Sequence, residues 1–472
     1  MRGLVWLRND LRLDDNLSFE SAFLECDEVL ALYFYSQEQW LNHNESNVKL
    51  DFLIQNLISL SGNLSKLNVP MIIVNSVNFD SISMELDEFL SENNIDKVYW
   101  NKEFGLNEER RDDEVKNSLR ASNFPFQDSN DQVLFEPGSL KTQQGGNFSV
   151  FTPFKNKWKL EFNEDLLPQN FNYTKRNTSS VQSNALAFDF NFKKTHSCDM
   201  SLWPIGEDNA LVRLEEFLTD RAANYERDRN DPDLEGTSRL SPYLALGIIS
   251  SRRCIRKAYE QNDCNLIKKN QGIVKWIDEL IWREFYRNIM YLNPKVSQHK
   301  PFKDSTKNIV WKYDEQQFNA WCEGQTGFPI IDAAMRQLKH EGWMHNRLRM
   351  VVAMFFTKNM FHDWRLGEKF FMENLIDGDF SSNNGGWQWS ASTGTDAAPY
   401  FRVFNPISQS EKFDKSGAFI RRYVPELKNL NSKEIHSPAE GLLYPEGYPR
   451  PMLNLKETRQ LAIETFKNHK DI

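Results

Sequence analysis

Val29-Leu30-Ala31-Leu32-Tyr33-Phe34 is an unbroken apolar run, which is typical of a strand buried on both faces of a parallel sheet. Three shorter strand-like runs and three segments with helical spacing surround it in alternation. The strand-like runs are Leu4 to Leu7, Met71 to Val74 and Lys97 to Trp100, and the helical segments are Leu17 to Phe23, Phe52 to Leu64 and Ile82 to Leu90. This alternation predicts an α/β domain with a doubly wound, Rossmann-like parallel sheet.

Ligands of such sheets bind beyond the carboxyl ends of the strands, so the loops after Leu7, Phe34 and Trp100 are the places to expect one. The sequence contains no Gly-x-Gly-x-x-Gly pattern and no Walker-type phosphate loop. A nicotinamide or nucleoside triphosphate site therefore lacks its usual sequence support.

The chain has 472 residues, more than the roughly 250 to 300 at which one hydrophobic core stops growing, so two domains are expected. Residues 1–130 carry the alternation of strands and helices. Residues 131–205 include a stretch rich in Asn, Ser, Thr and Lys, which predicts a long interdomain connection. Helical spacing dominates after Ala210, so residues 206–472 are expected to form a nearly all-α domain.

The composition is that of a globular protein, and we expect a cytoplasmic location. No apolar run approaches the ~20 residues of a membrane-spanning helix. Arg8 and Asp10 interrupt the N-terminal apolar stretch before it reaches the length of a secretory signal. The five cysteines are odd in number and form no Cys-x-x-Cys pair, so we expect neither a disulfide framework nor a bound metal.

The formal net charge of −9 is unevenly distributed. Residues 1–130 hold 11 lysines and arginines against 23 aspartates and glutamates, a net charge of −12, which leaves +3 for the remainder. This asymmetry permits nucleic-acid binding by the second part without requiring it.

The segment from Ile376 to Trp389 combines two carboxylates, three amides, two adjacent glycines and two indoles. Ordinary core packing does not require such a mixture. Eight of the thirteen tryptophans lie between Trp276 and Trp389, so the aromatic enrichment is local. The segment predicts a site for a redox-active ring.

Two further clusters have both a structural and a functional interpretation. The hydroxyls of Gly236 to Ser241 fit either a plain helix cap or a phosphate site at a helix N-terminus. Glu279, Trp282 and Arg283 share one helical face, which can grip a nucleobase or can be a buried indole beside a surface ion pair.

The segment from Trp343 to Met350 is more polar than a core helix should be. A buried Arg349 needs an anionic partner, and Asp377 or Asp379 is expected to supply it. For His345 an ordinary hydrogen-bonded histidine is the favoured interpretation.

Together these motifs resemble the photolyase/cryptochrome family of flavoproteins, most closely its bacterial class I members that act on cyclobutane pyrimidine dimers. The matching segments are Trp6 to Arg12, Phe151 to Phe154, Gly236 to Ser241, Trp276 to Arg287, Gly327 to Arg336, Gly342 to Met350 and Asp377 to Phe404. The resemblance implies an N-terminal antenna domain, a helical domain that binds one FAD, and light-driven DNA repair.

The resemblance also implies the residues of the flavin site and their roles. The cofactor-binding positions are Tyr225, Thr237, Ser238, Arg239, Leu240, Ser241, Trp276, Asn346, Arg349, Asp377, Asp379 and Asn383. Asn383 would face the flavin N5 and favour the reduced flavin, and catalytic roles are implied for Glu279, Asn346 and Asn383. Trp387, Trp364 and Trp311 match an electron relay, although each taken alone is most typical of a core residue.

The implied partner is ultraviolet-damaged DNA whose pyrimidine dimer is turned out of the duplex, bound by a monomer with no obligate protein partner. The implied DNA-binding positions are Arg229, Glu279, Trp282, Arg283, Asn346, Arg347, Met350, Trp389 and Arg402. Phosphate contacts should make this binding dependent on salt without reading base sequence.

The antenna chromophore is less defined. His43, Asn107 and Glu108 match folate-binding positions, so methenyltetrahydrofolate is the first expectation. Some relatives add a lysine from the helical domain, but the stretch from Lys295 to Lys300 does not align clearly with it. A deazaflavin or an empty site stays open.

The main alternative function is that of a cryptochrome-like blue-light photoreceptor without repair activity. Such proteins often carry a C-terminal extension, and the sequence ends at Ile472 without one. Repair of the 6-4 photoproduct is disfavoured because His345 is followed by Asn346, so the paired histidines of those relatives are missing.

Overall fold

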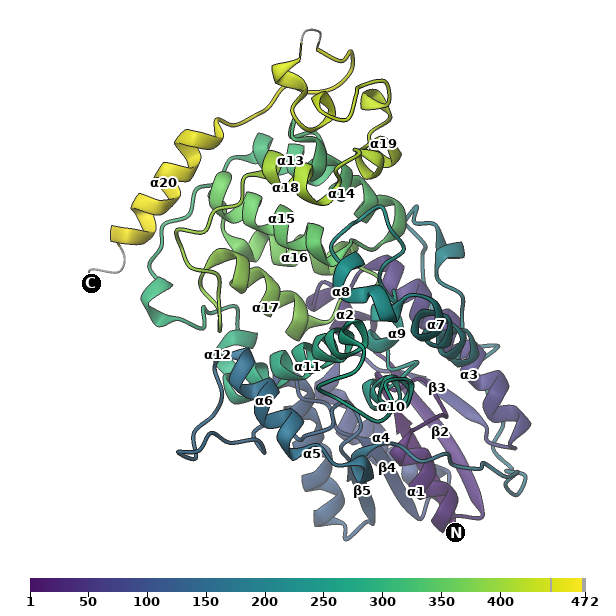
Figure 1. The fold of residues 1–472 in the computed structure, drawn as a ribbon. Helices are drawn as coiled ribbons and strands as arrows, with labels where there is room; N and C mark the ends of the chain where they lie inside the picture. The colour runs from purple at the N-terminus through teal and green to yellow at the C-terminus, as the bar shows by residue number, and fades with distance from the viewer. Residues whose placement is uncertain (442–443, 469–472) are drawn as a thin grey trace.

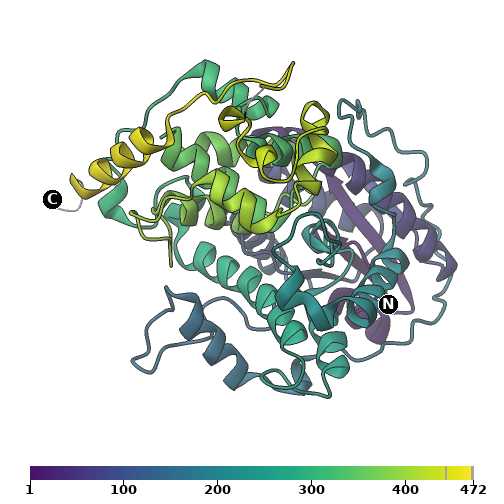
Figure 2. The same cartoon turned by 45° about the horizontal axis from the view of Figure 1, so that its top comes forward.

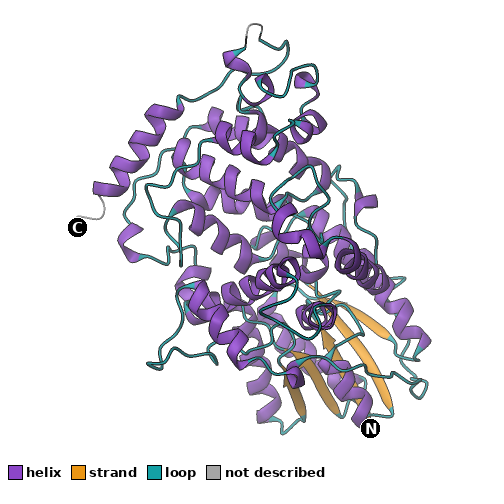
Figure 3. Cartoon of the chain, viewed as in Figure 1, coloured by secondary structure: helices purple, strands orange, loops and turns teal. Residues whose placement is uncertain are grey.

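The computed structural model describes residues 1–441 and 444–468, and its N-terminal part is built on a five-stranded sheet. The strands are β1 (Arg2–Leu7), β2 (Glu28–Tyr35), β3 (Met71–Asn75), β4 (Lys97–Asn101) and β5 (Phe126–Ser129). Their order is β3-β2-β1-β4-β5, and each neighbouring pair is parallel. Figure 3 shows these strands gathered beside the N-terminus, so the predicted α/β fold class is confirmed.

Both faces of the sheet are covered, because successive side chains of a strand point to opposite sides. Val5 and Ala31 lie in the cluster on one face, with helices α1 (Leu17–Glu25) and α3 (Asn47–Lys66). Leu4, Trp6 and Leu30 lie in the cluster on the other face, with α4 (Ile82–Glu92) and α5 (Leu106–Ala121). The arrangement is doubly wound, as predicted.

Strand β5, helix α5 and the short helix α2 (Gln37–Asn42) of this part were not predicted. Strand β5 is an edge strand whose side chains are all partly exposed, so its Phe-Gln-Asp-Ser sequence has no apolar run. Helix α5 is strongly polar and buries few apolar residues, among them Val115 and Leu119. Partial exposure therefore removed the hydrophobic pattern on which the prediction depends.

Residues 131–205 contain α6 (Phe151–Glu161), two short 3-10 turns and long irregular stretches. Part of this segment lies along the sheet. The side chain of Asn184 accepts from Ile73 N at 2.7 Å and donates to Ile73 O at 2.9 Å, which covers the free edge of β3. The domain limits themselves stay a prediction, because a single hydrophobic cluster extends from the sheet to the helical part.

The rest of the described chain is helical, as predicted, and wraps around the carboxyl end of the sheet (Figure 1). The helices are α7 (Glu207–Asp220), α8 (Tyr225–Asp228), α9 (Ser241–Ala245), α10 (Ser251–Gln261), α11 (Gln271–Leu292), α12 (Pro294–Ser297), α13 (Glu315–Glu323), α14 (Pro329–Glu341), α15 (Asn346–Met354), α16 (Trp364–Asn374), α17 (Phe380–Ala391), α18 (Pro406–Phe413), α19 (Ala418–Tyr423) and α20 (Leu455–Asn468). Figure 2 places α20 at the edge of the molecule away from the sheet. Among the described helices, none combines the length and the apolar character needed to cross a membrane.

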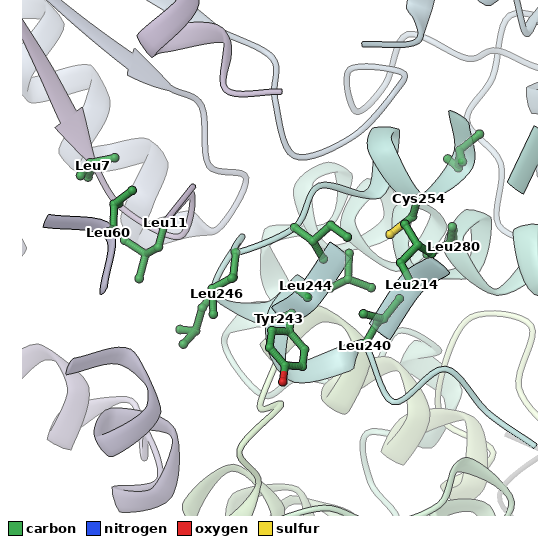
Figure 4. Close-up of a cluster of buried hydrophobic side chains, with 14 of the residues drawn as sticks. Leu7, Leu11, Leu60, Leu214, Leu240, Tyr243, Leu244, Leu246, Cys254 and Leu280 are labelled. Carbon is green, nitrogen blue, oxygen red and sulfur yellow. The ribbon is translucent and has the colours of Figure 1, made fainter. Parts of the chain in front are cut away.

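The two parts meet across apolar side chains and buried ion pairs. Figure 4 follows the apolar contact from Leu7 and Leu11 through Leu246 to Leu240. Beside it, Asp131 accepts from Arg12 at 2.6 Å and from Arg252 at 3.2 Å, and all three side chains are buried. Removing one partner of such a buried pair leaves an uncompensated charge, so this interface resists sliding or opening.

Candidate active site

A cavity of about 500 Å³ lies in the helical part, with walls from α11, α15, α17 and the loop before α9. Every predicted cofactor-binding residue lines it: Tyr225, Thr237, Ser238, Arg239, Leu240, Ser241, Trp276, Asn346, Arg349, Asp377, Asp379 and Asn383. These residues come from segments far apart in the sequence. The cavity also lies within the size range of ordinary cofactor sites.

The loop before α9 holds its hydroxyls in fixed positions. Trp276 Nε1 donates to Ser238 Oγ at 3.3 Å, and Trp343 Nε1 donates to Ser241 Oγ at 3.1 Å. Because each oxygen accepts from an indole, each hydroxyl hydrogen remains available to an anionic ligand. The loop is therefore equipped to bind phosphate oxygens.

Arg239 holds this loop in shape. Its backbone is left-handed (φ 51°), and its guanidinium pairs with Glu341 and Glu235, each at 3.1 Å. The same guanidinium lies 4.7 Å from the ring centre of Trp343. An unusual backbone conformation is thus fixed by two carboxylates and an indole.

Two arginines neutralise the two aspartates of the cavity, Asp377 and Asp379. Arg349 Nη2 donates to both oxygens of Asp377, at 3.0 and 2.7 Å, which confirms the partner predicted for it. Asp379 pairs instead with Arg287 at 2.7 Å. Burial alone would raise the pKa of Asp379, but Arg287, Arg283 and the Ser382 N–H hold that pKa well below its usual range.

Asn383 presents an acceptor to the cavity. Its Nδ2 donates to the main-chain oxygen of Glu368 at 2.9 Å, which leaves Oδ1 to the cavity. The helix that carries it, α17, packs closely on α11 at Gly385, where a Cβ would lie 2.2 Å from the ring of Tyr286. Gly385 therefore allows α17 to pack closely against α11.

The predicted face of α11 is confirmed, because Glu279, Trp282 and Arg283 all line the cavity. Glu279 is paired with Arg229. Trp282 stacks on Phe151 with ring centres 3.6 Å apart and planes within 10°, so one face of the indole is occupied by protein.

Arg283 points into the protein. Its guanidinium donates to Leu244 O at 2.8 Å and to Gln132 O at 3.3 Å, and burial with the nearby Arg287 lowers its pKa to about 9. A role at the DNA backbone stays a prediction for this residue, whose charge faces main-chain carbonyls here.

The first turns of α15 add polar groups to the same cavity. Asn346, Arg347 and Met350 line it, and Arg347 Nη2 donates to Asn230 Oδ1 at 2.6 Å. His345 Nδ1 accepts from Arg347 N at 3.2 Å, which caps the helix. Burial and Arg347 lower the pKa of His345 to about 3, so it is the neutral, hydrogen-bonded histidine that was expected.

Of the three predicted relay tryptophans, one lines the cavity and two lie outside its lining. Trp387 lines the wall, and its ring rests on Gly367, one helical turn from Trp364 on α16. Both indoles are buried, whereas Trp311 is partly exposed and packs against Phe361 with ring centres 5.2 Å apart. Trp364, Trp311 and the exposed Arg402 are outside the cavity lining, and Trp389 belongs to it.

The predicted antenna residues meet at a smaller cavity of about 90 Å³ at the carboxyl end of the sheet. His43 and Glu108 line it, and Asn107 Nδ2 lies 3.1 Å from His43 Nε2. Burial, with the nearby Glu103, raises the pKa of Glu108 to about 7. The loops after β1, β2 and β4 thus border a second cavity, which is smaller than ordinary cofactor sites, and its role stays a prediction.

Several residues at or next to the main cavity were not predicted as site residues, among them Tyr286, Ser382 and Arg287. Tyr286 and Ser382 line the cavity, and Arg287 pairs with Asp379. Tyr286 and Arg287 carried a signal, since they lie one turn after Trp282 and Arg283 on the face already singled out.

Comparison with known proteins gives a consistent result. Residues 3–171 match the family model described as DNA photolyase, and residues 276–468 match that described as FAD binding domain of DNA photolyase. The chain is 39% identical to the deoxyribodipyrimidine photo-lyase of Escherichia coli, over 98% of each chain, and 38% identical to that of Vibrio cholerae, over 99% of each.

The fold agrees with these matches. A class III photolyase from Agrobacterium tumefaciens superposes with a TM-score of 0.90 at 32% identity, covering 100% of this chain and 98% of that one. Family models, relatives and fold point the same way, and the chain belongs to the DNA photolyase family.

Proposed function

We propose that this protein is a deoxyribodipyrimidine photolyase that uses reduced FAD and light to split cyclobutane pyrimidine dimers in DNA. The observation that carries the proposal is one cavity in which Asn383 presents an acceptor beside the face formed by Glu279 and Trp282. A cofactor and an extruded pair of bases would meet there.

The residues present fit FAD. Hydroxyls of the loop before α9 suit the pyrophosphate, and Arg349 adds a positive charge that Asp377 holds in place. The acceptor at Asn383 suits the N5–H that only a reduced flavin carries. When bound, the reduced cofactor supplies a light-excited electron that enters the dimer and returns after the cyclobutane bonds break.

The protein contributes position and electrostatics to this reaction. Trp282 lines the cavity, where its indole would stack on a base, and Glu279 would offer a carboxylate to base N–H groups. Arg229, Arg347 and Arg402 are proposed to hold the DNA backbone. Photolyases extrude their target, which costs a few kcal/mol and least for a damaged base.

A direct assay tests the function. Purified protein with reduced FAD is mixed with duplex DNA containing thymine dimers, and recovery of thymine absorbance is followed under blue or near-ultraviolet light and in the dark. Recovery in the light only supports the proposal. Persistence of dimers in single-stranded and duplex DNA despite reduced FAD would favour a photoreceptor.

Replacement of Trp311 by phenylalanine is expected to slow photoreduction of oxidised FAD at least about tenfold, because phenylalanine is a far poorer electron donor than tryptophan. Repair by enzyme reduced beforehand should be unchanged. Transient absorption measures the first rate and the dimer assay the second. Trp100→Phe in the sheet is the control, and loss of repair in Trp311→Phe would contradict the relay.

For the antenna we propose methenyltetrahydrofolate at the cavity of His43, Asn107 and Glu108. An ionised Glu108 accepts from the pterin N–H groups, and its pKa is raised to about 7, so folate binding should strengthen as the pH rises from 6 to 8. Glu108→Gln should remove this dependence. Glu109→Gln is the control, because its pKa is also raised to about 7 by burial but its side chain is outside the cavity lining. Titration by absorbance, with a deazaflavin in parallel, measures both.

A further inference from the structure

A buried carboxylate, Glu368 of α16, connects the cavity to the surface. Its main-chain oxygen accepts from Asn383 Nδ2 at 2.9 Å, and its Oε1 accepts from Asn384 Nδ2 at 3.1 Å. Its side chain is 1% exposed. Glu368 therefore contacts two successive amides of α17, one of which lines the cavity.

The other carboxylate oxygen of Glu368 reaches a surface histidine. Glu368 Oε2 lies 3.1 Å from His299 Nδ1, and the His299 side chain is half exposed. The hydrogen bond to Glu368 raises the pKa of His299 although burial opposes this. Because the His299 side chain is half exposed, protons from the solvent can reach it. Among the described residues, His299 is the only ion-pair partner of Glu368.

The backbone at His299 favours a specific role. Its φ of 57° is left-handed, a conformation that costs a residue with a side chain roughly 1–2 kcal/mol. Arg365 Nε donates to His299 O at 2.6 Å and holds the turn. A glycine would adopt this turn at lower cost. The presence of a histidine here therefore favours a role for its imidazole.

We propose that the pair of His299 and Glu368 makes the reduction potential of the bound flavin depend on pH, because its carboxylate is a buried charge bound to Asn384, next to Asn383 on α17. This inference rests on the proposed function, in which Asn383 faces the flavin. With His299 protonated the pair is neutral. With His299 neutral a buried negative charge remains beside α17 and disfavours added electron density on the flavin.

Two other titratable residues, Arg365 and His43, interact electrostatically with His299. Arg365 of α16 lowers the pKa of His299, and His299 in turn lowers the pKa of His43, which follows α2 (Gln37–Asn42). The neighbouring Lys300 donates to Gln298. Glu368 remains the one carboxylate bonded to the ring among the described residues.

Spectroelectrochemical titration of the FAD-loaded protein between pH 5.5 and 9 tests the proposal. The wild-type potential should fall through an added inflection as the pH rises through the pKa of His299. His299→Gln should have the lower potential at pH 6, and Glu368→Gln the higher potential at pH 8. Both should lack the inflection, with the ratio of reduced to oxidised flavin changed at least about threefold in opposite directions.

A charge-retaining variant makes the test specific. His299→Lys keeps a positive charge beside Glu368 across this pH range, so its potential should follow the pH dependence of the flavin itself, continued from the acidic wild type, without the added inflection. Shifts of both glutamine variants in one direction, or an inflection that survives in His299→Gln, would overturn the proposal. If Glu368→Gln does not fold, the two His299 variants decide, since that side chain is half exposed. Failure of the wild type to bind FAD or repair dimers would instead count against the proposed function.

Discussion

Replacement of Arg349 by alanine is expected to lower FAD affinity at least about a hundredfold. The change removes a positive charge from the cavity and leaves Asp377, which is 2% exposed, without a partner. Truncating one member of a buried pair costs roughly 3–5 kcal/mol. Fluorescence titration of apoprotein with FAD measures the affinity, and thermal unfolding measures the stability.

Two further variants distinguish the loss of the Arg349 charge from a general loss of protein stability. Arg349→Ala combined with Asp377→Asn should recover thermal stability but not FAD affinity, because the uncompensated carboxylate is gone and the arginine is still missing. Arg422→Ala is the control, since its pair with Asp233 is exposed and worth only about 0–1 kcal/mol. Unchanged FAD affinity in Arg349→Ala would exclude this arginine from the cofactor site.

Replacement of Trp282 by alanine is expected to weaken binding of dimer-containing DNA roughly tenfold to a hundredfold. Stacking of a base on an aromatic side chain contributes about 1–3 kcal/mol, and the Trp282 indole lines the cavity and is held in place by its stack on Phe151. Affinity for undamaged DNA depends on phosphate contacts and should stay the same. Electrophoretic mobility shift or anisotropy titrations with both DNAs measure this.

Matched variants again identify the cause. Trp282→Phe keeps an aromatic ring and should retain most of the discrimination between damaged and undamaged DNA. Trp40→Ala removes a tryptophan at the sheet-end cavity and should leave both affinities unchanged. Equal weakening of both DNAs by Trp282→Ala would mean that the indole does not contact the lesion.

The sequence predicted those features that follow from periodicity or from an unmet need for charge. The shared face of Glu279, Trp282 and Arg283 follows from helical spacing. The pairing of Arg349 with Asp377 or Asp379 was predicted because a buried guanidinium needs an anion and the segment expected to hold a redox ring offers two aspartates.

Other contacts left no trace in the sequence. Glu368 receives Asn383 through a main-chain oxygen, and every residue has one, so no residue type marks the contact. Arg287 and Asp379 meet across 92 positions of chain, and only the packing of α11 against α17 decides which carboxylate each arginine takes. Strand β5 was missed because an edge strand can be polar.

The buried ion pairs of Arg12, Asp131 and Arg252 fix the sheet against the helical part. Chromophores held on the two sides of such a joint keep a constant separation and a constant angle between their transition dipoles. Resonance energy transfer depends on both quantities, so each molecule in a population would pass on absorbed light with the same efficiency. The fluorescence of a bound antenna would then decay with a single lifetime.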